Sequence, residues 1–477
     1  MGLGVDEELS PVLQEKVTLL GTLLSSFPEA HTALNAVLEQ VLGLKRIERQ
    51  TERIGDERVA ERDADAAEFV HKPLMEKIAA PSGIKAPDAI AISADGGRFQ
   101  LTGENPSAKT HWHEYKSGIV MELTSSVSAS DPCPDVPPEF LDHEFVSTLA
   151  RDIGQKAAAL AQEGQEPALE NGLAPSVVAA LCEADETSSA SETSSASETS
   201  SASETSSASE TSSASETSSK KRTQQKQKPA KSKKTKQKKK KKSHPARVPR
   251  PGLPKVESKE VVATRQNSQK FGVLLAARAW SVRAFAAARK AFIGDGQNWI
   301  WSVWKTHFAP FDFVPILDFV HALTYVFAAA MAGRTAAEGQ AVYVRWITWV
   351  WRGEVAQVIA ELAARQQELG LPTAADGSTH PRRIVSESLT YLQNQQSRMD
   401  YATYRQQGLP ITSSEMESTI KQINHRVKGS EKFWSERGAE AMLQLRADTL
   451  SDTAPLATFW KARPQKATGY RSYSHAA

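Results

Sequence analysis

Two aspartates in distant parts of the chain share one local context, an apolar run that leads into Asp-Gly. Residues 89–92 precede Asp95, and residues 291–294 precede Asp295. Both runs have the length and composition of buried strands. We expect each strand to present its carboxylate at its tip. The simpler interpretation of residues 95–97 is a tight turn, because Asp-Gly-Gly is a favourable turn sequence.

A third carboxylate, Glu417, is expected on a helix that begins at residues 413–414, which are two serines. Lys421, Asn424 and Lys428 fall with Glu417 on a polar stripe beside the apolar one. An acid beside cationic and amide groups suits a site where the acid meets a metal ion and the bases meet phosphate. The alternative is an ordinary i,i+4 ion pair on a solvated face.

Three carboxylates from two strands and one helix suit phosphodiester cleavage. Cleavage without a covalent intermediate needs charge stabilisation at the attacking and leaving oxygens. Two Mg²⁺ ions about 3.5–4 Å apart supply it, and such hard cations prefer carboxylate oxygens. The sequence therefore predicts a metal site formed by Asp95, Asp295 and Glu417. Glu415 is the second choice for the helical acid, although it falls on a different face of the helix.

The segments that would position these acids follow a mixed order of strands and helices. Residues 87–123 have strand patterns, and residues 271–285 have a helical one. Short strands are predicted at residues 291–295 and 311–319, followed by a helical stretch from about 322 to 408. The fold class is therefore α/β.

The N-terminal residues 1–80 are predicted to be helical. A helix, a short turn at Gly43 and a basic helix with Arg46, Arg49 and Arg53 on one face resemble a helix-turn-helix. Such an arrangement suits DNA binding, but a surface helix can also carry arginines for solubility alone.

The charge of the chain is concentrated in one low-complexity insert. The net charge is +2, yet residues 220–242 hold 14 Lys or Arg and no acid, and residues 183–219 hold 8 acids and no base. An "ETSSAS" repeat without large apolar residues cannot bury a core, so we expect residues 183–255 to be disordered. The basic tract would attract polyanions such as nucleic acid, or act as a solubilising linker.

A long apolar stretch at residues 314–333 raises the question of a membrane span. It contains Asp318 and His321, so we expect no span and no membrane partner. The two cysteines, Cys133 and Cys182, do not suggest a disulfide framework. The sequence thus favours a cytoplasmic protein.

Several separated blocks together resemble a known family. "ISADGGR", "GDGQNWIW", "ILDFVHA", the block around Glu417 and "FWKARPQKATGYRSY" occur in the order of DDE transposases from bacterial insertion sequences, in the group that includes the Mutator-like elements. The resemblance runs from about residue 10 to the end, apart from the insert. It implies an RNase H-like catalytic core with a mixed sheet.

The resemblance also implies roles for individual residues. Asp95, Asp295 and Glu417 would hold two Mg²⁺ ions, with Mn²⁺ as a substitute. Asp318 and His321 would lie on the neighbouring strand as supporting residues rather than primary ligands. Further DNA contacts are expected from Arg46, Arg49, Arg53, Lys421, Arg426, Lys428 and Trp349. Trp349 would stack on a distorted base, although tryptophans at this spacing are more often part of a core.

The expected domains follow the same resemblance. They are a helical DNA-binding region at 1–80, the first part of the core at 85–182, the disordered linker at 183–255, the second part of the core at 256–321, a helical insertion domain at 322–409, and the catalytic helix with the tail at 410–477.

The implied activity is cleavage of DNA at element ends, followed by attack of the freed 3′-hydroxyl on target DNA. Double-stranded DNA would be the partner of a nucleoid-associated homodimer or larger assembly. Three alternatives stay open: a domesticated or decayed transposase that binds DNA without cutting it, a structure-selective nuclease or resolvase, and a scaffold built around the insert.

Overall fold

The computed structural model describes residues 9–38, 41–79, 85–102, 111–163, 173–183 and 253–466. Most of the insert predicted to be disordered lies outside these ranges. Glu183 closes one helix and Lys255 begins a strand, so the described chain reaches into both ends of the predicted 183–255 segment.

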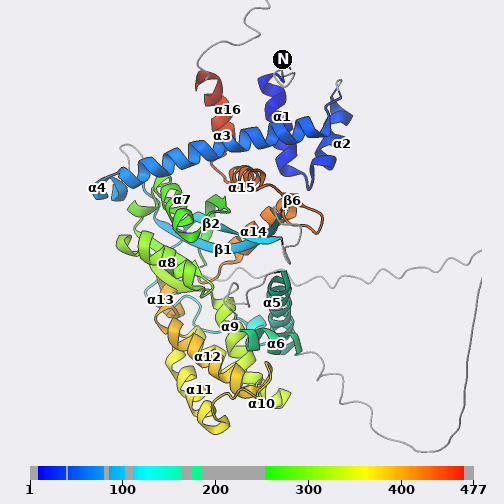
Figure 1. The fold of residues 1–477 in the computed structure, drawn as a ribbon. Helices are drawn as coiled ribbons and strands as arrows, with labels where there is room; N and C mark the ends of the chain where they lie inside the picture. Colours follow the sequence, from blue (N-terminus) through cyan, green and yellow to red (C-terminus); the bar gives the residue numbers. More distant parts are fainter. Residues whose placement is uncertain are drawn as a thin grey trace, which may run out of the picture. The chain divides into compact units, whose positions relative to one another are not determined.

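The core is a mixed sheet of six strands in the order β3-β2-β1-β4-β5, with β6 paired to β1 (Figure 1). β1, β2 and β3 are antiparallel neighbours, whereas β4 is parallel to β1 and β5 is parallel to β4. The predicted α/β class is therefore confirmed. The strands are β1 (Ala89–Leu101), β2 (Trp112–Thr124), β3 (Lys255–Thr264), β4 (Arg289–Gly294), β5 (Val314–Leu317) and β6 (Phe433–Trp434).

β1 does not end at Asp95, and the predicted turn at residues 95–97 is wrong. The strand continues to Leu101, and Asp95, Gly96 and Gly97 pair in register with residues 115–117 of β2. The glycines serve packing instead. A Cβ atom on Gly97 would lie 2.2 Å from Cζ of Tyr115, so the tyrosine ring fits only because that Cβ is missing.

Gly97→Ala is expected to destabilise the protein by about 2 kcal/mol, because the added methyl group overpacks a buried site. The Tyr115 hydroxyl donates to Asn424 Oδ1 at 2.9 Å, so the displaced ring should also disturb the helix of Glu417. Urea unfolding measures the first effect. Gly43→Ala is the matched control, because nothing lies within 4 Å of its Cβ position. Equal stability of the two variants would contradict this account of the glycine.

Helices cover both faces of the sheet. Gly118 of β2 faces Leu275 and Phe271 of α7 (Ser268–Ser281), and Lys116 on the same face lies over the Trp299 ring of α8 (Asn298–His307). Residues at odd and even positions of a strand face opposite sides. The opposite face, which carries Asp95 and Tyr115, therefore meets α14 (Ser414–Val427).

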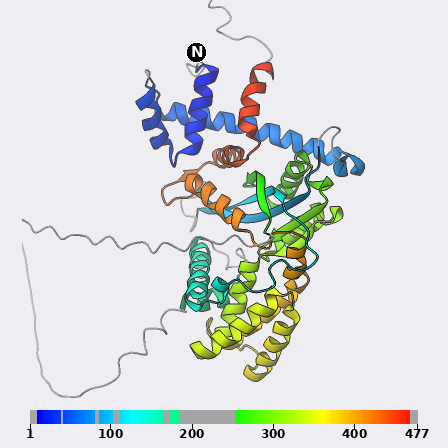
Figure 2. The same ribbon diagram turned by 180° about the vertical axis from the view of Figure 1, so that it is seen from behind.

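The N-terminal helices are α1 (Pro11–Leu23), α2 (Phe27–Val37), α3 (Leu44–His71) and α4 (Leu74–Ile78), which confirms the helical prediction for this region. α3 continues far beyond the pattern seen at residues 44–55, because it packs along α15 (Glu436–Leu450), which α16 (Pro455–Lys466) follows (Figures 1 and 2). At the crossing, a Cβ on Gly55 would lie 2.5 Å from Cβ of Ala441.

The region between β5 and α14 is helical, as predicted. It comprises α9 (Phe319–Met331), α10 (Ala336–Trp351), α11 (Val355–Leu369), α12 (Pro381–Gln395) and α13 (Tyr401–Gln406). Two earlier helices, α5 (His143–Glu163) and α6 (Pro175–Glu183), join it, since α6 packs on α9 and α12. In the part of the chain that the structure describes, no helix combines the length and hydrophobicity needed to cross a bilayer.

Candidate active site

The three predicted acids line one cavity of about 320 Å³. They come from β1, from the end of β4 and from α14, which are far apart in the sequence. Helix α5 supplies the opposite wall. The lining residues are Ala94, Asp95, Gly96, Gly97, Arg98, Ile153, Lys156, Ala157, Ala159, Leu173, Asp295, His321, Ser413, Glu417, Ile420, Lys421, Asn424 and Lys428.

The register of the sheet explains why the two aspartates meet. The parallel pairs of β1 and β4 run from Ala89↔Arg289 to Ser93↔Ile293. Two residues further along the same register, Asp95 comes beside Asp295. Neighbouring strands lie about 4.8 Å apart, and residues at equivalent positions point to the same side.

Each aspartate is held by nearby donors. The Gly96 N–H donates to Asp95 Oδ1 at 2.6 Å. Gln297 donates to Asp295 twice, from its backbone N–H to Oδ1 and from Nε2 to Oδ2, both at 3.0 Å. Asp295 lies directly after β4, so the prediction of a carboxylate at a strand tip is correct for this residue and wrong for Asp95.

The two carboxylates are costly to ionise together. Burial raises the pKa of Asp95 to about 8, and the neighbouring charge of Asp295 adds to this shift, with a smaller contribution from Glu417. Burial also raises the pKa of Asp295. A cation bound between them would offset this repulsion.

Asp318 and His321 lie at the site, but not on a strand as predicted. β5 ends at Leu317, and Asp318 is the N-cap of α9, where its carboxylate accepts from the N–H groups of Val320 at 2.6 Å and Ser413 at 2.8 Å. An aspartate directly after a strand suits this cap, because its oxygens satisfy N–H groups that the first helical turn leaves open. Asp318 therefore joins the starts of α9 and α14.

His321, in the first turn of α9, is a half-buried counter-charge to the acids. Its Nδ1 lies 3.9 Å from Asp318 Oδ2. Burial lowers the pKa of His321, but the charges of Asp318, Asp295 and Asp95 outweigh it and raise the value to about 9. For Asp318, burial acts to raise the pKa, and the nearby His321 and the bonds from Ser413 reverse the shift, so this carboxyl stays ionised.

The polar stripe of α14 faces the cavity as the sequence predicts. Glu417, Lys421, Asn424 and Lys428 all line it. The alternative ion pair is present as well, since Lys421 Nζ lies 3.5 Å from Glu417 Oε2. Glu415 lies 4.0 Å from Lys259 Nζ and does not line the cavity, which favours Glu417 as the helical acid.

The carboxylate oxygens of Asp95, Asp295 and Glu417 are suitable ligands for a hard divalent cation, although the three side chains do not surround a single point. Within the described ranges, no group of three or more His, Cys, Asp and Glu side chains is arranged to hold a metal ion. The buried Asp295, the half-buried Asp95 and the nearby Glu417 still provide the oxygen ligands that Mg²⁺ and Mn²⁺ prefer.

One predicted DNA contact is wrong. Arg426 is 1% exposed, its Nε donates to the Gly21 carbonyl at 3.0 Å, and its guanidinium lies over the rings of Phe27 and Trp434. It follows Ile423 by three positions and thus lies on the buried face of α14, where it joins the helix to the N-terminal region.

The other predicted contacts lie in varied settings. Arg46 is half-buried, and Arg49 and Arg53 are exposed, with Arg53 donating to Gln50 Oε1 at 2.7 Å. Trp349 is half-buried and packs against the core beneath the Arg345 guanidinium, as the core interpretation predicted.

The wall formed by α5 was not predicted from the sequence. Ile153 and, one helical turn later, Lys156 and Ala157 line the cavity. No local pattern in residues 143–163 indicates that this helix faces the three acids, because the contact joins segments far apart in the sequence.

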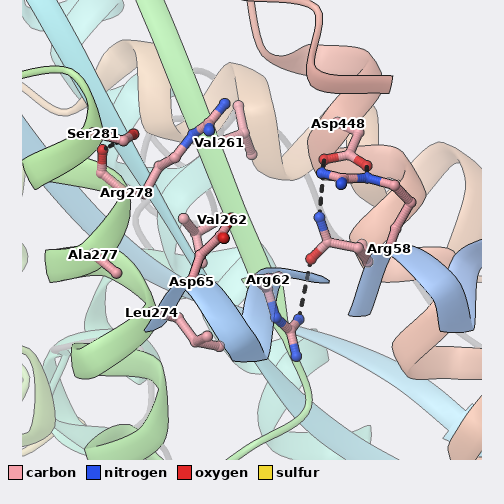
Figure 3. Close-up of a pocket in the computed structure, with 11 residues that line it drawn as sticks. Arg58, Arg62, Asp65, Val261, Val262, Leu274, Ala277, Arg278, Ser281 and Asp448 are labelled. Carbon is pink, nitrogen blue, oxygen red and sulfur yellow. Dashed lines mark hydrogen bonds and ion pairs between the residues drawn. The ribbon is translucent and has the colours of Figure 1, made fainter. Parts of the chain in front are cut away.

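A second pocket lies between α3, β3, α7 and α15, and Figure 3 shows the residues that line it. Its three arginines are engaged by acids: Arg58 with Asp448 at 2.8 Å, Arg62 with Glu440 at 3.0 Å, and Arg278 with Glu260. This network joins α3 to the core. Because each of the three arginines is paired with a carboxylate, the pocket does not favour binding of an anion.

In comparisons with known proteins, no protein-family model, curated protein or solved structure matches the chain.

Proposed function

We propose that this chain is a DDE-type DNA transposase that catalyses metal-dependent cleavage at element ends and transfer of the 3′-hydroxyl strand into target DNA. The observation that carries the proposal is that Asp95, Asp295 and Glu417 line one cavity. The mixed sheet with strand order β3-β2-β1-β4-β5, and the acids on β1, after β4 and on α14, supports the proposal, in which this sheet forms an RNase H-like core.

In this proposal, Asp95, Asp295 and Glu417 hold two Mg²⁺ ions, for which Mn²⁺ substitutes. When bound, the ions stabilise charge on the attacking and leaving oxygens of the phosphodiester. The protein keeps the acids in place: Gln297 orients Asp295, Gly96 orients Asp95, and Asp318 joins the start of α14 to that of α9. The positive charge of His321 offsets part of the negative charge of the aspartates.

The walls of the cavity suit a nucleic-acid strand. Lys156, Lys421 and Lys428 provide cationic groups for phosphates, and a bound phosphate would compete with Glu417 for Lys421. Ile153, Ala157 and Leu173 form an apolar surface for sugar and base. The partners are double-stranded DNA and further copies of the chain at the nucleoid, since joining two ends requires at least two sites.

Cleavage of a labelled duplex that carries the DNA flanking the gene tests the proposal. With Mg²⁺ or Mn²⁺, the wild type should nick the element boundary. Glu417→Gln should cut at least about 100-fold more slowly, because it loses a group that stabilises transition-state charge. Glu415→Gln is the matched control on the same helix, and its rate should match the wild type.

The same assay separates the remaining candidates. Binding without any cut in wild type and variant would favour a domesticated, non-catalytic DNA-binding protein. Cutting without joining of the 3′-end to a target would indicate a nuclease or resolvase.

A further inference from the structure

The connection between β4 and α8, which carries Asp295, is contacted by α12. Gly296 has φ of +108°, a value that glycine adopts readily and residues with a Cβ rarely do, so this position requires a glycine. The ring of Tyr391, from α12, fills the space beside this glycine. A Cβ on Gly296 would lie 2.7 Å from Tyr391 Cε2.

Helix α12 also satisfies the backbone of this connection. The Tyr391 hydroxyl donates to the Asp295 carbonyl at 2.8 Å, and Gln395 Nε2 donates to the Gly296 carbonyl at 3.3 Å. Gln395 Oε1 in turn accepts from Arg398 Nη1 at 2.7 Å, and that guanidinium lies over the Trp301 ring. Two consecutive carbonyls next to the acid are thus held by the helical region rather than by the sheet.

Tyr391 is itself fixed from a second side. Its ring stacks on Tyr325 of α9, with centroids 3.7 Å apart and planes 10° from parallel. The Tyr325 hydroxyl accepts from the Ala174 N–H at 2.8 Å. The two hydroxyls therefore have different partners. That of Tyr391 bonds to the backbone of Asp295, and that of Tyr325 bonds to the backbone at the start of α6.

We infer that Tyr391 is a positioning residue for Asp295, and that the helical region at 319–406 sets the geometry of the second carboxylate. Tyr391 does not line the cavity, so it acts through the backbone of Asp295 and not on substrate. The consequence for metal affinity rests on the proposed function, whereas the consequence for the Asp295 connection does not.

Two single-hydroxyl deletions in the full chain test the inference. Tyr391→Phe keeps the stacked ring and removes the bond to Asp295. Tyr325→Phe is the matched control, because it keeps the same stack and removes the bond to Ala174. Hydrogen exchange followed by mass spectrometry on peptides spanning 293–299 reports the connection, and titration with Mn²⁺ followed by electron paramagnetic resonance reports the site.

Tyr391→Phe should raise amide exchange in that peptide by about tenfold, as expected for the loss of one supporting hydrogen bond. It should also weaken Mn²⁺ binding by about tenfold, as for other residues that orient metal ligands. Tyr325→Phe should leave both unchanged. This pattern supports the inference.

Two results would overturn it: unchanged exchange in Tyr391→Phe, or wild-type Mn²⁺ binding that both variants retain. Faster exchange confined to Tyr391→Phe in a protein that binds no Mn²⁺ would support the positioning role and count against the proposed function instead.

Discussion

Asp95→Asn should cut DNA about 10³-fold more slowly than the wild type, and yet unfold at a higher temperature in metal-free buffer. The loss of rate follows because metal-ion stabilisation is worth several kcal/mol, and about 1.4 kcal/mol corresponds to tenfold. The gain in stability follows because asparagine cannot ionise. The wild-type carboxyl is half-buried, and its desolvation together with the charge of Asp295 raises its pKa to about 8.

The raised pKa of Asp95 also determines how the stability of the metal-free protein changes with pH. An unfolded aspartate has a pKa of about 3.9, so the stability contributed by protonated Asp95 is full below that value and is lost as pH rises towards about 8. His321 acts in the same direction, because its pKa of about 9 lies above that of an unfolded histidine. The metal-free wild type should therefore melt at a lower temperature at pH 8.5 than at pH 6.

Thermal unfolding with EDTA at both pH values measures the effect. Asp95→Asn should show a smaller decrease between them than the wild type. Asp88→Asn is the control, because this aspartate stands just before the same strand with 73% of its side chain exposed. A steeper loss of stability in Asp95→Asn, or retained cleavage, would contradict the assignment.

Arg405→Ala is expected to destabilise the fold by about 3 kcal/mol, because it removes the buried guanidinium that pairs with the Asp131 carboxylate. Arg405 is 4% exposed. Its Nε donates to Asp131 Oδ1 at 3.0 Å, its Nη2 donates to the Trp351 carbonyl at 2.9 Å, and its guanidinium lies 4.0 Å from the centre of the Trp351 ring. It thus joins the chain after β2 to α10 and α13.

Guanidinium unfolding measures this loss. Arg437→Ala is the matched control, since Arg437 binds Asp56 at 2.6 Å with 75% of its side chain exposed. Such a surface pair contributes at most about 1 kcal/mol. Similar losses for the two variants would show that burial does not determine the strength of the Arg405 contacts.

Much of the site could be predicted because its chemistry is written locally. Asp95 and Asp295 each follow an apolar run, and Glu417 shares a helical stripe with two lysines, so residue type and spacing were sufficient. The interpretation of residues 95–97 as a turn failed because Asp-Gly-Gly satisfies two demands. A tight turn favours it, and so does a strand that must make room for the Tyr115 ring, which lies elsewhere in the sequence.

The missed features all depend on contacts between distant segments. Arg426 is of a residue type that often binds phosphate, but two aromatic rings and the N-terminal helices enclose it. The role of Tyr391 depends on a stack with Tyr325 and on one carbonyl of Asp295. No local pattern indicates such partners, because they are fixed only when the tertiary structure forms.

The adjacent strands β2 and β3 are separated by about 130 residues of sequence, from Thr124 to Lys255. A ribosome adds about 5–20 residues per second. During synthesis, the edge of β2 that pairs with β3 therefore stays unpaired for on the order of ten seconds at this elongation rate. An unpaired strand edge is a template for other chains, so the nascent protein passes through a period of exposure to aggregation that its finished sheet no longer reveals.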